Sequence, residues 1–210
     1  MTDPQPNFRS ATHQRLLTCA ANILEAEGLV AVQARRIARE AECSVGTLYN
    51  VFGDIDGLLL AVNAETLAKL GEAVRAGAAE VADLDLRQQL AGLATVYLRF
   101  ALANRQRWDA VFKHRLPAGR EAPASYIEEQ ARLLAVIEGP LAAVLPNAER
   151  RAAAARALFG AVHGIVALAL DDRLGGQLKR ELEAQLDFIT DVTARGLMAN
   201  AADAHQAASE

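Results

Sequence analysis

The nine residues SVGTLYNVF, beginning at Ser44, gather small polar side chains whose chemistry suits phosphate groups and nucleobases. The hydroxyls of Ser44 and Thr47 can donate hydrogen bonds to phosphate oxygens. The carboxamide of Asn50 can pair with an adenine edge through two hydrogen bonds, and Val45 can touch a thymine methyl group. This stretch is therefore a candidate surface for reading DNA.

Several of these residues also have a purely structural interpretation. Ser44 stands where a side-chain oxygen can cap a helix by accepting from an unpaired backbone amide. Gly46 would let the backbone approach DNA closely, with a tolerated surface glycine as the alternative. Tyr49 could pack its ring on a core and reach a phosphate with its hydroxyl, or be an ordinary core tyrosine. Leu48 and Phe52 are assigned to core packing alone.

Two arginines, Arg35 and Arg36, begin a short helix that we expect over residues 34–41. A cation at a helix start is disfavoured by the helix dipole unless an anion lies near it, so a phosphate partner is expected. The alternative is an ion pair with Glu40 or another nearby acid. The first 56 residues hold five arginines and seven acids. The overall charge therefore does not indicate DNA binding, and the hypothesis depends on local geometry.

Apolar residues at helical spacing predict three short helices followed by a long one that links two domains. We expect these helices at residues 10–27, 34–41 and 44–52, and from Asp54 or Asp56 onward. Gly28 follows the first helix, where a left-handed helix end favours glycine.

Helical periodicity continues through the rest of the chain, and no alternating pattern argues for a sheet, so the predicted fold is all-α. Further helices are expected at residues 86–103, 105–113, 124–145, 148–171 and 177–199. The polar end AADAHQAASE is expected to be a flexible tail over residues 201–210.

Two short helices joined by a tight turn and packed on a first helix form a helix-turn-helix, whose later helix enters the major groove of DNA. The string IAREAECSVGTLYNVF, from Ile37, followed by GDIDGLLLAV, closely resembles the DNA-binding signature of TetR/AcrR regulators. The resemblance spans residues 10–62. The predicted DNA-binding residues are Arg35, Arg36, Ser44, Val45, Gly46, Thr47, Tyr49 and Asn50.

The chain departs from the family pattern at four places. The family often has Thr or Ser at Gln33, Gly at Glu42, His or Tyr at Val51, and Lys near Ile55 or Asp56. Because each change loses a usual phosphate contact or turn residue, we expect fewer phosphate contacts here. The slope of log affinity against log salt is about 0.9 per phosphate neutralised. It should therefore be shallower for this protein than is usual in the family.

Segments 97–119 and 157–175 resemble the C-terminal domain of the TetR subgroup named after a Trp-His-Gly motif, although Val162 stands in place of the Trp. A ligand-sensing domain needs a mostly apolar cavity oriented by a few polar groups. The aromatic residues could equally be ordinary core, and His163 a hydrogen-bonded core histidine. The candidate effector-binding residues are Tyr97, Phe100, Trp108, Phe112 and His163.

The last two predicted helices carry apolar residues over wide arcs, so each must pack on two sides. A two-fold four-helix interface would satisfy both, and the resemblance implies the same homodimer, which would read a palindromic operator. The predicted dimer-interface residues are Phe159, Val162, Val166, Leu182, Leu186 and Ile189.

The resemblance implies a helix-turn-helix DNA-binding domain over residues 1–54 and a helical ligand-binding and dimerisation domain over 55–200. The expected function is a repressor released from operator DNA by a hydrophobic or amphipathic effector. A co-repressor is the reverse possibility. In the expected mechanism the effector binds one conformation of the dimer better than the other. It thereby changes the spacing of the two recognition helices through the fourth helix.

No cofactor or metal is expected, since the two cysteines fit neither a disulfide framework nor a metal cluster. No uninterrupted apolar run reaches about 18 residues and the start is polar, so we expect a cytoplasmic protein without a membrane span. An enzyme is disfavoured because the four histidines lie far apart and no HExxH or GxSxG occurs. A protein-binding helical adaptor stays open, since the N-terminal part has no basic face.

Overall fold

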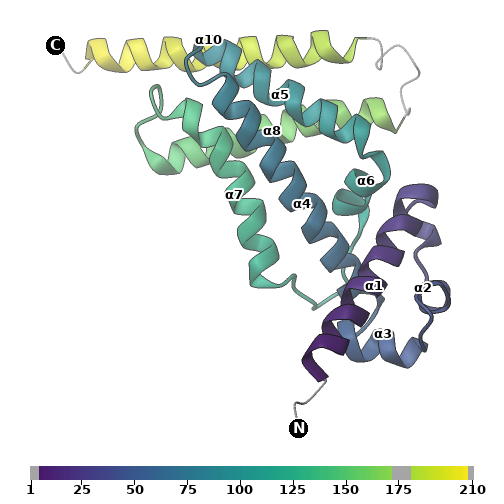
Figure 1. Ribbon diagram of the computed structural model, residues 1–210. Helices are drawn as coiled ribbons and strands as arrows, with labels where there is room; N and C mark the ends of the chain where they lie inside the picture. The colour runs from purple at the N-terminus through teal and green to yellow at the C-terminus, as the bar shows by residue number, and fades with distance from the viewer. Residues whose placement is uncertain (1–4, 172–180, 208–210) are drawn as a thin grey trace. The chain divides into compact units, whose positions relative to one another are not determined.

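The computed structural model describes residues 5–171 and 181–207, and within these residues the regular structure is entirely helical (Figure 1). The predicted all-α fold is confirmed. The elements are α1 (Gln5–Glu27), η1 (Leu29–Ala31), α2 (Ala34–Glu40), α3 (Val45–Phe52), α4 (Ile55–Glu80), α5 (Leu86–Ala103), α6 (Arg105–Lys113), α7 (Ala124–Leu141), α8 (Ala148–Leu170) and α10 (Leu182–Ala207).

The predicted helix boundaries hold to within one residue for α2, α3, α5, α6 and α8 and for the start of α4, and less well for α1, α7 and α10. The first helix begins five residues earlier than predicted, and α7 ends at Leu141 because a turn over residues 142–144 follows. The 3-10 turn η1 was not predicted. At the other end, α10 continues to Ala207 through most of the expected tail, in keeping with the high helix propensity of its alanines. Residues 177–180, where that helix was predicted to begin, lie outside the described residues.

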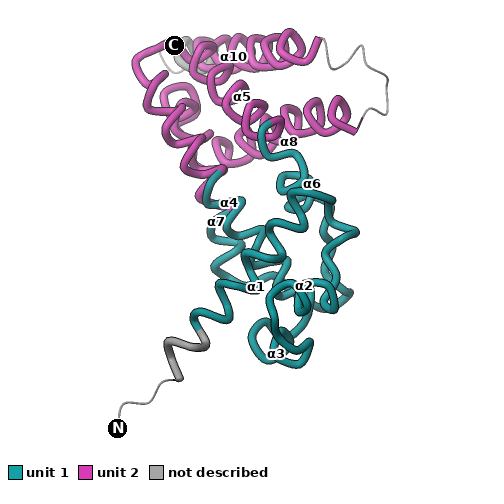
Figure 2. Tube along the Cα trace, turned by 45° about the vertical axis from the view of Figure 1, so that its right-hand side comes forward, with its two compact units in different colours: residues 1–69, 103–129 teal, residues 70–102, 130–210 magenta. Residues whose placement is uncertain are grey.

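The chain divides into two compact units, coloured separately in Figure 2. The N-terminal unit comprises residues 1–69 and 103–129, and the C-terminal unit comprises residues 70–102 and 130–210. Thus α6 and the segment after it belong to the unit that holds α1, α2 and α3. The domain boundary expected after residue 54 is not tested by this division and stays a prediction.

A shared apolar core holds the helices of the N-terminal unit together. Leu16 and Leu24 of α1, Ile37 of α2, Leu48 of α3 and Leu58 of α4 each have 0% of their surface exposed. Burying a side chain of this size stabilises the fold by about 1.5–3 kcal/mol. The core therefore fixes α3 through its inward side and leaves the other side exposed.

The turn between α2 and α3 ends α2 in an unusual way. The backbone amide of Cys43 donates to the carbonyl of Ala38 at 2.9 Å, and that of Glu42 donates to Arg39 at 3.2 Å, which is a Schellman ending. Glu42 has a φ of 51°, the left-handed conformation that glycine adopts without strain. A non-glycine residue costs about 1–2 kcal/mol there. The departure noted at residue 42 therefore keeps the turn but strains it.

In the C-terminal unit, α8 and α10 lie side by side (Figure 1) and bury one face of each helix. By length and composition alone α8 could span a membrane, and α3 with α4 could do so only as a pair bent by 61°. A core helix of a soluble protein passes the same test. The buried residues of α8 are Ala155, Leu158, Val162, Val166, Ala169 and Leu170, so this helix is in part a core element.

Candidate nucleic-acid interface

Ser44 starts α3 by capping it. Its side-chain oxygen accepts from the backbone amide of Thr47 at 3.0 Å, and the two hydroxyl oxygens lie 2.9 Å apart. The cap satisfies one of the amides that every helix start leaves unpaired. Both hydroxyl oxygens retain lone pairs and can bond a further group, so the capping role predicted for Ser44 leaves contact with a phosphate open.

Three residues, Gly46, Tyr49 and Asn50, form the outward face of α3. They recur at helical spacing, and each is exposed, with 46% of the surface of Tyr49 accessible. Leu48 is fully buried on the opposite side, as predicted. Val45 is only half-buried. The structure thus presents Asn50 and Tyr49 together on one strip of the helix, where a DNA groove could receive them.

Gly46 has no internal reason to be glycine. A Cβ atom added there would meet only the Ser44 hydroxyl oxygen, at 3.6 Å, which is an ordinary van der Waals contact. Residue 46 also lies in a regular helix, where alanine is preferred over glycine by about 0.5–1 kcal/mol. Packing within the chain therefore does not require glycine at residue 46, and the close approach of DNA expected there stays a prediction.

The two arginines of α2 differ in their surroundings. Arg36 donates to both carboxylate oxygens of Glu27, one at 2.8 Å, and to Glu40 at 2.9 Å. These hydrogen bonds raise the pKa of Arg36 and lower that of Glu27. Arg36 is thus occupied by acids of its own chain, the alternative considered from the sequence, whereas Arg35 is exposed. Of the two, Arg35 is better placed to meet a phosphate.

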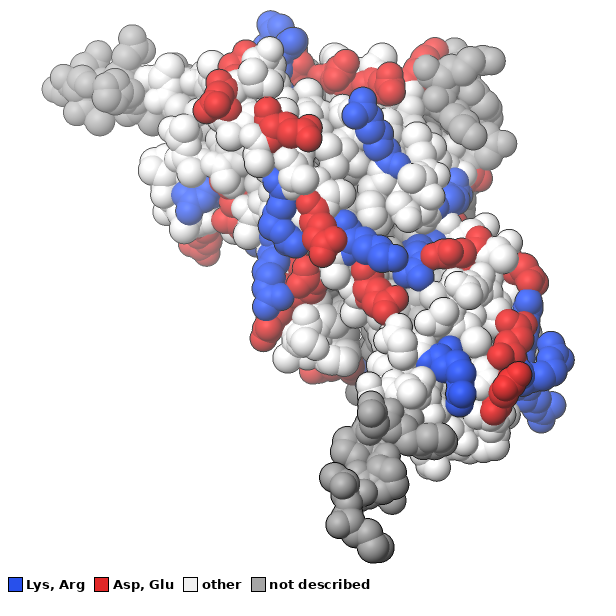
Figure 3. Space-filling view, viewed as in Figure 1, with Lys and Arg blue, Asp and Glu red and all other residues white. Residues whose placement is uncertain are grey.

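Charges on the N-terminal unit alternate in sign. Figure 3 shows acidic and basic side chains interspersed over the visible face of this unit, without a continuous basic area. This distribution agrees with the excess of acids over arginines in the first 56 residues. The contribution of general electrostatic attraction to DNA binding should accordingly be small.

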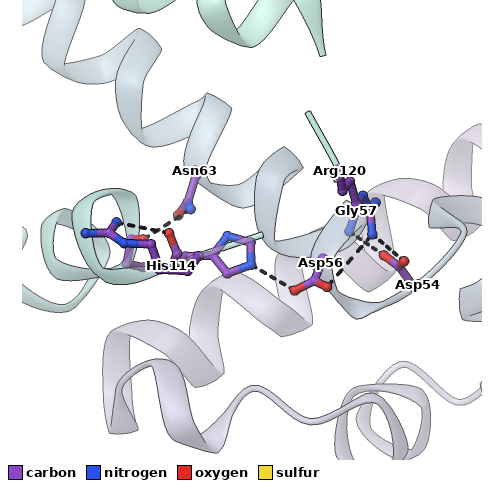
Figure 4. Close-up of polar contacts among 8 residues, drawn as sticks. Asp54, Asp56, Gly57, Asn63, His114 and Arg120 are labelled. Carbon is purple, nitrogen blue, oxygen red and sulfur yellow. Dashed lines mark hydrogen bonds and ion pairs between the residues drawn. The ribbon is translucent and has the colours of Figure 1, made fainter. Parts of the chain in front are cut away.

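A polar cluster surrounds the α3–α4 corner, meaning residues 53–57 (Figure 4). Asp54 accepts from the backbone amide of Gly57 at 2.8 Å and pairs with Arg120. The ring nitrogen Nε2 of His114 lies 2.9 Å from a carboxylate oxygen of Asp56. The Arg120 hydrogen bond and the Gly57 amide hold the pKa of Asp54 below its usual range.

Sequence reasoning missed this cluster, because Arg120 and His114 follow the corner by more than 50 residues. One signal was available. No Lys or Arg occurs between Arg39 and Lys69, although that stretch includes Asp54 and Asp56, so a cation from elsewhere in the chain was needed.

Arg107 is a second missed residue. It lies on α6 with only 6% of its surface exposed, pairs with Glu25 of α1, and has Nη1 3.7 Å from a carboxylate oxygen of Glu65 on α4. A buried cation needs such partners, since desolvation of an unpaired charge is costly. The ion pairs attach α6 to the N-terminal unit.

Of the candidate effector-binding residues, the structure brings Tyr97 and His163 together. The Tyr97 hydroxyl lies 2.7 Å from Nδ1 of His163, and the ring of Phe159 packs edge-on against Tyr97 and stacks on the imidazole. Burial lowers the pKa of His163, so the imidazole is neutral at pH 7. Phe100 lies one turn further along the same helix, α5, as Tyr97.

The other two candidates belong to the N-terminal unit. Trp108 and Phe112 lie on α6 with ring centroids 5.1 Å apart, and Trp108 is 2% exposed. Their contact fits the core alternative considered from the sequence.

The predicted dimer-interface residues separate into two groups. Four are buried within the subunit, namely Val162, Val166, Leu182 and Leu186. Phe159 and Ile189 are half-buried. The apolar arc of each helix is wide. One part of it packs α8 against α10 and buries the first group, and the rest of the arc faces outward. Large apolar side chains that stay exposed on these helices are Leu168, Phe188, Val192 and Met198.

Among the described residues, no three His, Cys, Asp or Glu side chains gather closely enough to hold a metal ion. What the N-terminal unit does present is a capped helix, outward-facing and carried by a three-helix core, which is the arrangement of helix-turn-helix DNA-binding proteins.

Comparison with known families places the chain within this class. Residues 16–62 match the family described as "Bacterial regulatory proteins, tetR family", and residues 90–193 match "Tetracyclin repressor-like, C-terminal domain". Together the two matches cover more than half of the chain. The protein belongs to the TetR family of transcriptional regulators. Neither description names the Trp-His-Gly subgroup, so that expectation stays a prediction.

Solved structures share the fold over almost their whole length. A protein of unknown function from Rhodococcus sp. RHA1 is 25% identical, with a TM-score of 0.72 over 92% of this chain and 99% of that one. A TetR-like transcriptional regulator from the same source is 21% identical, with a TM-score of 0.59 over 90% and 96%.

The transcriptional regulator FadR from Bacillus subtilis, solved in complex with stearoyl-CoA, is 15% identical, with a TM-score of 0.62 over 85% of this chain and 97% of that one. No curated protein matches the sequence.

Proposed function

We propose that this protein is a dimeric repressor that binds a palindromic operator through α3 and is released by a small apolar or amphipathic effector. The observation that carries the DNA-binding part is the outward face of α3. There, Asn50 and Tyr49 are exposed, and Gly46 is a glycine at a position where the surrounding structure has room for a Cβ atom. Family membership supports it independently.

A second copy of the chain is the proposed occupant of the outward side of α8 and α10. Phe188 is 69% exposed and lines a groove together with residues that include Ile165, Ala184 and Ile189. Exposed apolar surface of this kind marks an interaction site, and two-fold symmetry lets one patch cover itself. A dimer places two α3 helices at a fixed spacing, which is what a palindromic site requires.

For the effector we propose the part of the C-terminal unit around Tyr97, Phe159 and His163. A neutral imidazole hydrogen-bonded to a phenol beside an aromatic ring offers one polar contact in apolar surroundings. The same-fold regulator FadR was solved with stearoyl-CoA, so acyl thioesters belong in the first ligand screen. The effector would act by binding one conformation of the dimer better than the other.

A regulator of this kind needs neither catalysis nor a membrane. We therefore propose that the protein is cytoplasmic and is not an enzyme.

The test of the proposed function is a gel shift with DNA from the region upstream of the protein's own gene, repeated with candidate effectors. The proposal expects a discrete complex that an effector dissolves. It would be abandoned if the protein bound that DNA no better than a shuffled duplex of equal length.

A further inference from the structure

The α3–α4 corner fixes the direction of α3 relative to α4. The chain bends by 61° between the two helices. Gly53 ends α3 with a φ of 81°, and Asp54 caps α4 through the Gly57 amide. A Cβ atom added at Gly57 would lie 2.1 Å from the carbonyl oxygen of Phe52, so the end of α3 touches the first turn of α4 directly.

Residues from outside the helix-turn-helix hold this corner. Arg120 pairs through Nη1 with one carboxylate oxygen of Asp54 and lies 3.8 Å from one of Asp56. Its Nη2 atom lies 3.6 Å from the position of an added Cβ at Gly57. His114 holds the second oxygen of Asp56 from the same segment, as Figure 4 shows. Because a carboxylate only accepts, Nε2 of His114 carries the hydrogen.

Because Asp54 and Asp56 neutralise the Arg120 guanidinium, its attraction to a DNA phosphate should be weak. Its guanidinium is shared between two carboxylates that start α4, and the nearest Lys or Arg on either side of them in the sequence are Arg39 and Lys69, about 13–17 residues away. Without Arg120, Asp54 and Asp56 would lose their cation and repel each other at the point where α3 is oriented. We propose that Arg120 is a positioning residue for DNA recognition, which holds the α3–α4 corner without touching DNA.

This inference rests on the proposed DNA-binding function, and the test separates the two. The full-length protein and its Arg120→Gln variant are titrated with two duplexes: one selected by the wild-type protein from a randomised pool, and a shuffled duplex of the same composition. We expect Arg120→Gln to weaken binding to the selected duplex by about three- to tenfold, as befits partly exposed ion pairs. Binding to the shuffled duplex should not change.

The salt dependence and the ratio of the two affinities exclude other roles. A direct phosphate contact would lower the slope of log affinity against log salt by about 0.9 when Arg120 is removed, whereas a positioning residue leaves it unchanged. A partly unfolded variant would lower the apparent affinity for both duplexes by the same factor. Its ratio of selected to shuffled affinity would stay that of the wild type.

Two further variants serve as controls. Arg115→Gln makes the same chemical change in the same segment, at an exposed side chain whose hydrogen bonds within the described part of the chain go to the carbonyls of Phe112 and His114. It should bind both duplexes like the wild type. Arg120→Lys should restore part of the loss, because it keeps the charge but not the forked geometry that spans two carboxylates.

A wild-type ratio of affinities in Arg120→Gln, or a lowered salt slope, would overturn the inference alone. A wild-type protein that fails to select any duplex would overturn the proposed function and the inference with it.

Discussion

At the level of single residues, the outward face of α3 separates what the fold needs from what a partner needs. Leu48 is completely buried, and its exchange would damage the fold. Gly46, Tyr49 and Asn50 contribute little to that core, since all three are exposed. Substitutions on this face should therefore change DNA binding without changing stability by a comparable amount.

Gly46→Ala tests this separation most simply. The variant should be as stable as the wild type or more stable by up to about 0.5–1 kcal/mol, because alanine favours a helix and the added Cβ meets only an ordinary contact. Its affinity for operator DNA should fall about tenfold, since the methyl group occupies the space of a close approach. Urea unfolding and a binding titration measure the two effects. Unchanged affinity would show that DNA does not approach residue 46.

Arg35 and Arg36 form a matched pair for a salt titration. Arg35→Gln should weaken binding to any duplex and reduce the salt slope by about 0.9, as expected for one lost phosphate contact. Arg36→Gln should leave the slope unchanged, because Glu27 and Glu40 already neutralise that guanidinium. An equal reduction of the slope in both variants would mean that Arg36 leaves its acids when DNA binds, and an unchanged slope in Arg35→Gln would show that Arg35 contacts no phosphate.

Much of this face could be predicted from the sequence, because a helix of eight residues determines its own inward and outward sides. The Ser44 cap and the buried Leu48 follow from local spacing. The partners of Arg36 could be only partly foreseen. Glu40 is one turn away, whereas Glu27 approaches only after α1 and α2 have packed.

At the level of elements, the Tyr97–His163 contact links α5 to α8. Burial lowers the pKa of His163 below the usual value of about 6.5. The unfolded chain therefore binds this proton more readily than the folded one. The stability that His163 contributes is present above about pH 6.5 and is lost as the pH falls from there toward the folded-state pKa.

The corresponding prediction concerns His163→Gln. Between about pH 7 and pH 5 the free energy of unfolding should fall less steeply in the variant than in the wild type, because one of the groups that bind protons on unfolding is gone. Urea unfolding at several pH values measures this, and NMR titration of the imidazole gives the pKa directly. An imidazole pKa at or above 6.5 in the folded protein would contradict the account.

The helices themselves were largely predictable, and their tertiary partners were not. Residues 86–103 and 105–113 become helices with those limits because apolar spacing and turn residues are local signals. Nothing local assigns α6 to the N-terminal unit. That assignment depends on tertiary contacts, namely Ala110 in the N-terminal core and the Arg107 ion pairs with Glu25 and Glu65, which join helices distant in sequence.

At the level of the whole molecule, the proposed reading of a palindromic operator depends on dimerisation. The sequence predicted interface residues from apolar character alone, and so could not divide the arcs of α8 and α10 into an inner and an outer side. The structure places Val166 inside and Phe188 outside. The outer side is where we expect the partner subunit.

Phe188→Glu should weaken the dimer at least about a hundredfold. Each copy loses roughly 1.5–3 kcal/mol of apolar burial, and the change occurs twice in a two-fold interface. Analytical ultracentrifugation over a range of concentrations measures the dissociation. Val30→Glu is the control, since Val30 is 89% exposed on η1 in the N-terminal unit, and it should leave the dimer intact. A variant at residue 188 that dimerises like the wild type would exclude this face.

The most direct test of the central claim, that paired α3 helices read DNA, is selection of duplexes from a randomised pool by the full-length protein, followed by sequencing. We predict enrichment of an inverted repeat whose half-sites lie about one helical turn apart or a multiple of it. We also predict that Asn50→Ala relaxes the preference at one base pair in each half-site. A pool that stays random, or an enriched site without two-fold symmetry, would contradict the account.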